Sequence, residues 1–307
     1  MALHNSFRRI ASALPRRSIP TTTTITTSPL AATSAACRYS IQPRRFMVSV
    51  AVDETSGIGT MTMTSPPVNS ITLEFMEAFI STLDEAVKNP ACKGLVLTSG
   101  VPRVFSGGLD ILTMYNPDVE KARLFWYTFQ RLWMDLYLSP IPTVAALNGA
   151  APAGGTILAC SCDYRVMDNN PKLRMGLNET LLGIVAPWWT VKMFVATVGQ
   201  REAERALALG RLYSPAEALA VGLVDEAVES SAVAATAEAE LKKWMGINAG
   251  ARFATKKLLR TALVDELLSF DRENDIDMFI DVITAPKTQK VMGAYLAQLQ
   301  GQKAKKN

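Results

Sequence analysis

One carboxylate near the middle of the chain stands in an apolar stretch. Glu179 lies in the run GLNETLLGIV at residues 176–185, where most of its neighbours are apolar. Removing a carboxylate from water raises its pKa, and a base whose pKa lies near neutrality accepts protons well at that pH. Glu179 is therefore a candidate general base. A glutamate near a helix start is also commonly a cap or a surface residue, and this run alone leaves both roles open.

Two glycine-rich segments come before this glutamate and could bind an anionic oxygen. Residues 105–110 read FSGGLD, and residues 148–155 read NGAAPAGG before an apolar run. Glycine pairs let the backbone turn sharply and let a ligand approach its N–H groups. Small residues that open a helix expose unpaired N–H groups at the positive end of its dipole. An ordinary tight turn and close helix packing are the competing explanations.

Several other chemistries are excluded by the residue types present. The chain has one histidine, His4, so a mature protein without it cannot use a Ser-His-Asp mechanism or a histidine-ligated metal. The four cysteines lack CxxC spacing, which argues against a zinc site and a disulfide framework. There is no GxxxxGK[ST] phosphate loop, and the GxG at 57–59 lacks the third glycine of a dinucleotide fingerprint.

The elements that must position these residues alternate between strands and helices. Short apolar runs predict strands at 47–52, 60–64, 94–99, 143–147 and 164–167, with a turn at 54–59. Helical spacing of large apolar residues predicts a helix after Asn69-Ser70 that ends near 89, and a long one over 118–138. This alternation favours an α/β fold with parallel pairing. SPAE at 214–217 predicts a capping box, and three or four helices are expected from about 231 onward.

The N-terminal segment has the composition of an import sequence. Residues 1–52 contain seven arginines, no lysine and no acid, together with many serines and threonines. We interpret residues 1–45 as a mitochondrial targeting segment that is removed; a disordered basic tail is the alternative. Subtracting this +7 from the overall +4 leaves −3 for the rest, so the net charge does not indicate a nucleic-acid surface. No apolar run approaches the ~18 residues of a membrane-spanning helix.

Taken together, the three segments resemble the crotonase superfamily, also called the enoyl-CoA hydratase/isomerase family. The similarity spans roughly residues 47–300 and continues through ERALALG at 204–210, SPAEAL at 214–219 and GLV at 222–224. It implies a crotonase-like α/β fold, a spiral of ββα units followed by a C-terminal helical trimerisation region. We expect the spiral core and active site within 46–230 and the helical region within 231–307.

The resemblance also implies the roles of individual residues. The loop that would bind the coenzyme A part of the substrate comprises Ser106, Gly107, Gly108, Leu109 and Asp110. The backbone N–H groups of Leu109 and Gly154 would form the oxyanion hole for the thioester carbonyl, where donors stabilise charge that develops during the reaction. Glu179 would be the catalytic acid and base. Arg103, Lys256 and Lys257 are candidates for the coenzyme A phosphates, or equally solvated surface.

The number of acids decides which reaction the resemblance implies. Hydratases of this family use two glutamates, one aligned with Glu179 and one at the position held here by Ile157, which cannot hold a water. A double-bond shift needs one base. The resemblance thus implies an isomerase of fatty acid β-oxidation that moves a 3-cis or 3-trans double bond of an enoyl-CoA to the 2-trans position. The alternatives are a hydratase or other acyl-CoA enzyme of this fold, and a non-catalytic RNA-binding or structural protein.

The implied partners follow from the same family. We expect an acyl-CoA substrate, no cofactor beyond the coenzyme A that the substrate carries, no metal, no nucleic acid and no membrane insertion. A homotrimer in the mitochondrial matrix is expected. The preferred acyl length is not readable, because it depends on how large side chains pack, notably Trp126, Trp133, Trp188 and Trp189.

Overall fold

The computed structural model describes residues 47–269 and 272–304. These residues belong to one compact unit that spans 42–307. The predicted targeting segment at 1–45 lies outside the described residues. Among the described helices, none is both long enough and apolar enough to cross a bilayer.

A six-stranded sheet forms the centre of this unit. Its strands, in spatial order, are β1 (Val48–Asp53), β2 (Ile58–Met63), β4 (Gly94–Ser99), β7 (Thr143–Leu147), β9 (Tyr164–Asp168) and β11 (Glu226–Val228). β1 and β2 form an antiparallel hairpin, and the remaining neighbours pair in parallel. The predicted parallel pairing is therefore confirmed, and the ends of the five predicted strands lie within two residues of the expected positions. The edge strand β11 was not predicted.

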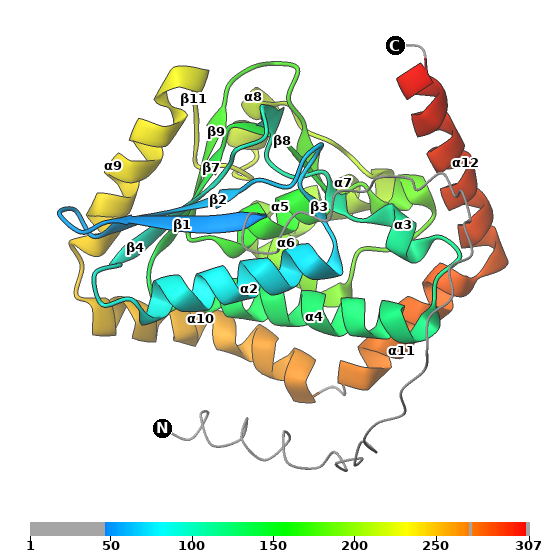
Figure 1. The fold of residues 1–307 in the computed structure, drawn as a ribbon, viewed down its shortest axis with the longest axis horizontal. Coiled ribbons are helices and arrows are strands. Elements are labelled where there is room, and N and C mark those ends of the chain that lie inside the picture. The colour runs from blue at the N-terminus through cyan, green and yellow to red at the C-terminus, as the bar shows by residue number, and fades with distance from the viewer. Residues whose placement is uncertain (1–46, 270–271, 305–307) are drawn as a thin grey trace, which may run out of the picture. The chain divides into compact units, whose positions relative to one another are not determined.

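Both faces of the sheet are covered by helices, as the strand sequences require. β7 is buried along its whole length. Its Ala145 and Leu147 belong to the larger core with side chains of α2 (Leu73–Lys88) and α4 (Val119–Tyr137), whereas Val144 and Ala146 pack with α9 (Val233–Met245) on the other face. Figure 1 shows α9 on one side of the sheet and α2 and α4 on the other. A continuous apolar run is typical of such a doubly covered strand.

The predicted helix signals are confirmed where local chemistry sets the boundary. Asp118 caps α4 by accepting from the Lys121 N–H, and Ser214 and Glu217 form the expected capping box of α8 (Pro215–Ala220). The remaining helices are α3 (Ile111–Met114), α5 (Gly154–Ser161), α6 (Trp188–Val198), α7 (Gln200–Leu209), α10 (Ala249–Ser269), α11 (Arg272–Thr284) and α12 (Pro286–Ala304), with 3₁₀ turns η2 (Glu179–Leu182) and η3 (Ser230–Ala232). Within the described residues, four α-helices thus follow residue 231, in agreement with the three or four expected.

Two small sheets hold the glycine-rich segments together. β5 (Arg103–Val104), β8 (Gly149–Pro152) and β10 (Met175–Gly176) form one, with β8 in the middle. β3 (Ser70–Ile71) pairs in parallel with β6 (Gly108–Leu109) to form the other. These pairings bring segments that are far apart in sequence to one place.

The C-terminal helices dock on the core through buried polar groups. One oxygen of the Asp275 carboxylate, Oδ2 on α11, accepts from the Trp126 indole at 2.8 Å, the Gln130 amide at 2.7 Å and the Trp189 indole at 3.3 Å. The rings of Trp126 and Phe279 stack at 3.8 Å between centroids. Burying a carboxylate is unfavourable unless it is hydrogen-bonded, so these contacts fix α11 against α4 and α6.

Candidate active site

The two glycine-rich segments meet at their backbones. A methyl group placed on Gly154 would lie 3.1 Å from the Leu109 nitrogen, and one on Gly108 would lie 3.1 Å from the Gly154 nitrogen. Gly108 has φ +90°, which a residue with a side chain rarely adopts. The structure therefore brings Leu109 and Gly154, the two predicted oxyanion donors, next to each other. Only glycine allows this approach.

The start of α5 presents backbone donors at the same place. The first bond inside this helix runs from the Ile157 N–H to the Ala153 carbonyl at 3.1 Å. The N–H groups of the preceding helical residues, Gly154 among them, have no partner within the helix and lie at its positive end. Ala153, the N-cap, has φ +48° and ψ −119°. Strain of this kind is common where a backbone is held for function.

The SGGLD loop, residues 106–110, is fixed by a buried network of hydrogen bonds. Asn69, which is fully buried, donates from Nδ2 to the Ser99 hydroxyl at 2.8 Å and to the Phe105 carbonyl at 2.9 Å. The Ser106 hydroxyl donates to the Asn69 carbonyl at 2.8 Å and accepts from the Gly108 N–H at 3.2 Å. The loop that carries the Leu109 donor is thus fixed by Asn69 and Ser106.

The sequence does not predict this network, because it indicates only that a helix begins after Asn69-Ser70. Thr72, not Asn69, caps α2. Asn69 has φ +49°, and asparagine is one of the few residues that tolerates this conformation. A buried role for it was signalled only by its place between a strand and a helix, which is too weak a pattern to use.

The remaining loop residues take structural positions. The Gly107 N–H donates to the Val68 carbonyl at 2.7 Å. Asp110 caps the short α3, and one of its oxygens accepts from the Thr113 hydroxyl at 3.0 Å. The assignment of residues 106–110 to coenzyme A binding stays a prediction.

Glu179 opens the 3₁₀ turn η2 and faces an apolar cavity of about 260 Å³. The residue as a whole is half-buried, but its Oε2 atom is sealed from solvent and has no hydrogen-bond partner among the described residues. Burial raises the pKa of its carboxyl to about 7. The cavity is lined by Leu177, Glu179, Thr180, Val185, Ala186, Val191, Leu207 and Ala208. Within it Glu179 is the one ionisable group, so the arrangement provides a lone base beside an apolar surface.

The position of this turn is set by its neighbours on both sides. The Thr180 hydroxyl donates to the Leu207 carbonyl of α7 at 3.0 Å, and Gly183 ends the turn in a left-handed conformation with φ +71°. On the other side, β10 ends three residues before Glu179 and pairs with β8, the strand that leads to Gly154. Glu179 is thereby tied to the segment that carries Gly154, one of the two predicted oxyanion donors.

Ile157 lies inside the protein, one turn into α5. It is 1% exposed and belongs to the larger core. The position where the resemblance implies a second glutamate in hydratases is therefore apolar and packed in this protein.

The four tryptophans expected to shape the acyl pocket do not line the cavity beside Glu179. Trp133 and Trp189 contact at 4.6 Å between ring centroids, and Trp126 packs on Phe129 at 5.6 Å and on Phe279. These aromatic rings pack against one another. The wall of the cavity beside Glu179 is instead formed by aliphatic side chains, apart from Glu179 and Thr180.

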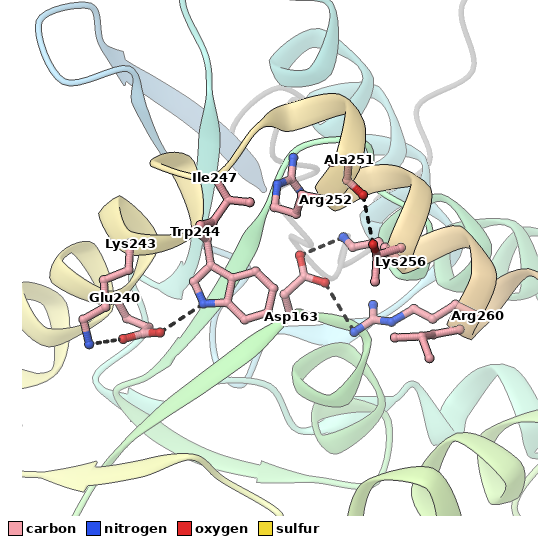
Figure 2. A pocket seen from close by; sticks show the side chains of 11 residues that line it. Asp163, Glu240, Lys243, Trp244, Ile247, Ala251, Arg252, Lys256 and Arg260 are labelled. Carbon is pink, nitrogen blue, oxygen red and sulfur yellow. Dashed lines mark hydrogen bonds and ion pairs between the residues drawn. The ribbon is translucent and has the colours of Figure 1, made fainter.

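A second cavity, of about 640 Å³, lies between α9 and α10, and Figure 2 shows its side chains. Its buried acid, Asp163, is paired with Lys256 at 2.7 Å and with Arg260 at 3.3 Å. Lys256 also donates to the Ser139 carbonyl at 2.9 Å, so it is a buried, paired residue and not solvated surface; its assignment to the coenzyme A phosphates stays a prediction.

Metal and thiol chemistry have no visible site in the described part of the chain. No group of three or more His, Cys, Asp or Glu side chains there could hold a metal ion. Cys160 and Cys162 are buried, and burial raises the pKa of their thiols to about 11 and about 12. Such thiols stay protonated at neutral pH and are unreactive.

Comparison with known proteins places this site in a family. The enoyl-CoA hydratase/isomerase family matches residues 53–304. The chain is 45% identical over 263 residues to the mitochondrial enoyl-CoA delta isomerase 1 of Mus musculus, covering 85% of this chain and 91% of that protein. It is 41% identical to the Homo sapiens protein of the same name, covering 85% and 87%.

Solved structures agree with these sequence matches. The crystal structure of human mitochondrial delta3-delta2-enoyl-CoA isomerase superposes with a TM-score of 0.82 at 40% identity, covering 84% of this chain and 99% of that one. An enoyl-CoA hydratase from Mycobacterium ulcerans superposes with a TM-score of 0.67 at 26% identity, covering 78% and 98%. The match over residues 53–304 includes both glycine-rich segments and Glu179, and the chain belongs to the enoyl-CoA hydratase/isomerase family.

Proposed function

We propose that this protein is an enoyl-CoA isomerase that moves a 3-cis or 3-trans double bond of a fatty acyl-CoA to the 2-trans position. The observation that carries the proposal is the lone buried carboxyl of Glu179 beside an apolar cavity, with the apolar Ile157 where a hydratase would need a second acid. Hydration requires a water held between two carboxylates. A double-bond shift requires one base that first takes a proton and then returns it.

The proposed reaction has two proton transfers through the same group. Glu179 removes a proton from C2 of the 3-enoyl thioester, and the electron pair moves into the carbonyl to give a dienolate. The Leu109 and Gly154 N–H groups stabilise the negative oxygen, a contribution of about 3 to 4 kcal/mol for each such donor elsewhere. The protonated Glu179 then gives its proton to C4, and the remaining double bond joins C2 and C3. No atom is gained or lost.

A pKa of about 7 suits Glu179 for both steps. At neutral pH a large fraction of the enzyme holds the carboxylate that the first step needs. The acid formed is strong enough to protonate C4 in the second step, because a catalytic group works best when its pKa lies near the working pH.

The decisive test is turnover of 3-hexenoyl-CoA, followed by the absorbance of the conjugated 2-enoyl thioester and by chromatography of the product. We expect 2-trans-hexenoyl-CoA from the wild type, and a loss of kcat of about 10³-fold or more in Glu179→Gln, which keeps the shape of the side chain. A 3-hydroxyacyl-CoA made directly from 2-hexenoyl-CoA at a comparable rate would assign the protein to the hydratases. Full isomerase activity in Glu179→Gln would refute the mechanism.

We also propose that the protein acts in mitochondria, in the matrix, after removal of residues 1–45. The composition of that segment supports this, as does the word mitochondrial in the names of the isomerases it resembles. The test is N-terminal sequencing of the protein isolated from mitochondria. A mature chain that still begins at Met1 would contradict it.

The proposed assembly is a homotrimer. Support comes from apolar side chains that the isolated chain leaves exposed on α10, Leu258 at 85% and Leu259 at 78%. Large exposed apolar groups of this kind are typical of subunit contacts. Light scattering should give a trimer for the wild type and smaller species for Leu258→Glu, whereas a monomeric wild type would refute the assembly.

A further inference from the structure

Thr156 lies at the third position of α5, is fully buried, and makes two short hydrogen bonds through its hydroxyl. The hydroxyl donates to the Ala151 carbonyl at 2.6 Å and accepts from the Gly176 N–H at 2.7 Å. Neither partner belongs to α5. The side chain therefore links three separate elements, α5, β8 and β10.

These elements carry the two parts of the proposed active site. Ala151 belongs to β8, which leads within three residues to Gly154, and Gly176 ends β10 three residues before Glu179. The Gly176 carbonyl also accepts from the Ala153 N–H at 2.8 Å. Both backbone polar groups of Gly176 are thus bonded to the segment that carries the Gly154 donor.

Gly176 is also confined on its other side. A methyl group placed on it would lie 2.4 Å from the Arg211 carbonyl oxygen, and its φ is +142°. The chain between Gly176 and Glu179 therefore starts from a backbone that is held on both sides. The Thr156 hydroxyl supplies the side-chain part of this restraint.

We propose that Thr156 is a positioning residue that sets the offset between the Glu179 carboxyl and the oxyanion donors. The inference rests on the proposed isomerase function. Thr156 does not touch the substrate in this role. It acts through Gly176, because proton transfer at C2 requires the base and the oxyanion hole to hold the same thioester in one geometry, and a displacement of about 1 Å can cost about 10²-fold in rate.

A purely structural role would look different. A helical threonine commonly bonds the carbonyl four residues earlier in its own helix, which affects helix stability and little else. Thr156 instead bonds a carbonyl five residues earlier, outside the helix, and an N–H twenty residues later. If the role is only structural, removal of the hydroxyl lowers stability and leaves the kcat of the folded enzyme unchanged.

The test compares Thr156→Val, which keeps the shape and removes both bonds, with Thr156→Ser, which keeps the hydroxyl. On 3-hexenoyl-CoA we expect Thr156→Val to lose about 10²-fold in kcat, with KM and the Kd of the unreactive hexanoyl-CoA within about threefold of wild type. Thr156→Ser should recover kcat to within about threefold. Thr156→Cys, a weaker hydrogen-bonding group of similar size, should fall between them and serves if the valine variant does not fold.

A matched control is Thr82→Val on α2. The Thr82 hydroxyl is also buried and donates to a strand carbonyl, that of Val48, but it lies away from both glycine-rich segments. It should lose stability in thermal unfolding and keep kcat. Equal kcat in Thr156→Val and wild type, or an equal loss in Thr156→Ser and Thr156→Val, would overturn the inference. A wild type that does not turn over 3-hexenoyl-CoA would instead refute the proposed function.

Discussion

The pH dependence of the reaction follows from the environment of Glu179. Its carboxyl lies against an apolar cavity, one of its oxygens has no partner among the described residues, and burial raises its pKa from 4.5 to about 7. The first proton transfer needs the carboxylate. With a pKa of about 7, about one tenth of the free enzyme holds the carboxylate at pH 6 and about nine tenths at pH 8. We therefore expect kcat/KM to rise about tenfold between pH 6 and pH 8.

Few other groups can produce a change in this window. The chain has one histidine, His4, and it lies in the predicted targeting segment. The pKa values of the buried thiols of Cys92, Cys160 and Cys162 are raised by burial, away from neutrality. Burial also raises the pKa values of the Asp135 and Asp225 carboxyls. A titration near pH 7 is therefore assigned to Glu179 by its loss in Glu179→Gln.

The shape of the pH profile of kcat/KM also distinguishes a mechanism with one base from a mechanism that needs a second, protonated group. Because the same proton is taken and returned, kcat/KM should rise to a plateau and stay there up to about pH 9. A mechanism that needs a second group protonated gives a bell-shaped curve. The assay is initial rates on 3-hexenoyl-CoA at pH 5.5 to 9, with residual Glu179→Gln activity as the flat control. A wild-type profile that is flat from pH 6 to pH 8, as expected for an exposed glutamate with a pKa of about 4.3, would refute the reasoning.

Three further predictions concern stability. The folded protein binds the Glu179 proton more tightly than the unfolded chain, so the wild type loses stability as pH rises from 4.5 towards 7. Glu179→Gln should therefore be more stable than the wild type by about 3 kcal/mol at pH 8 and by less than about 1 kcal/mol at pH 5. Urea unfolding that gives the same difference at both pH values would contradict this. Ser106→Ala leaves the Gly108 N–H without its hydroxyl partner, and we expect it to lower the free energy of unfolding by about 1 to 3 kcal/mol and to lower kcat. A kcat equal to that of the wild type would contradict this prediction. Lys256→Met removes the nearer of the two cations paired with the buried Asp163 carboxylate and leaves Arg260 and the hydrogen bonds from Thr143. We expect it to cost about 3 to 5 kcal/mol in urea unfolding with KM unchanged, and a shifted KM would mean that the α9–α10 cavity is not merely structural.

The larger elements could be predicted because their signals are local. The apolar run of β7 and the caps at Asp118 and Ser214 act within a few residues, and the boundaries they predict agree with the structure. The two-residue strands β3, β5, β6 and β10 were not predicted. Each exists only because it pairs with a distant segment, as β10 does with β8, and no pattern within two residues encodes a partner.

The site was predictable in its chemistry and not in its support. Glu179 stands out in sequence because its neighbours are apolar, and the glycines stand out because few other residues allow a close backbone approach. Asn69 and Thr156 do not stand out. The groups that hydrogen-bond the Asn69 amide and the Thr156 hydroxyl lie up to 36 residues away in the chain, so the roles of both side chains become visible only once the chain has folded.

The features that favour the proposed reaction are each unfavourable for folding. Ala153 holds a backbone conformation that costs of order 1 to 3 kcal/mol, and Glu179 keeps a buried oxygen that none of the described residues bonds. Both lie within the segments that β8 and β10 join. A fold selected for stability alone would relax the first with a glycine and replace the second with an apolar side chain. The strained Ala153 backbone and the buried Glu179 oxygen occur at one place, while the surrounding core is tightly packed. The proposed chemistry therefore best explains these two unfavourable features. Variants that stabilise the protein at these two positions should therefore be the ones that lose activity.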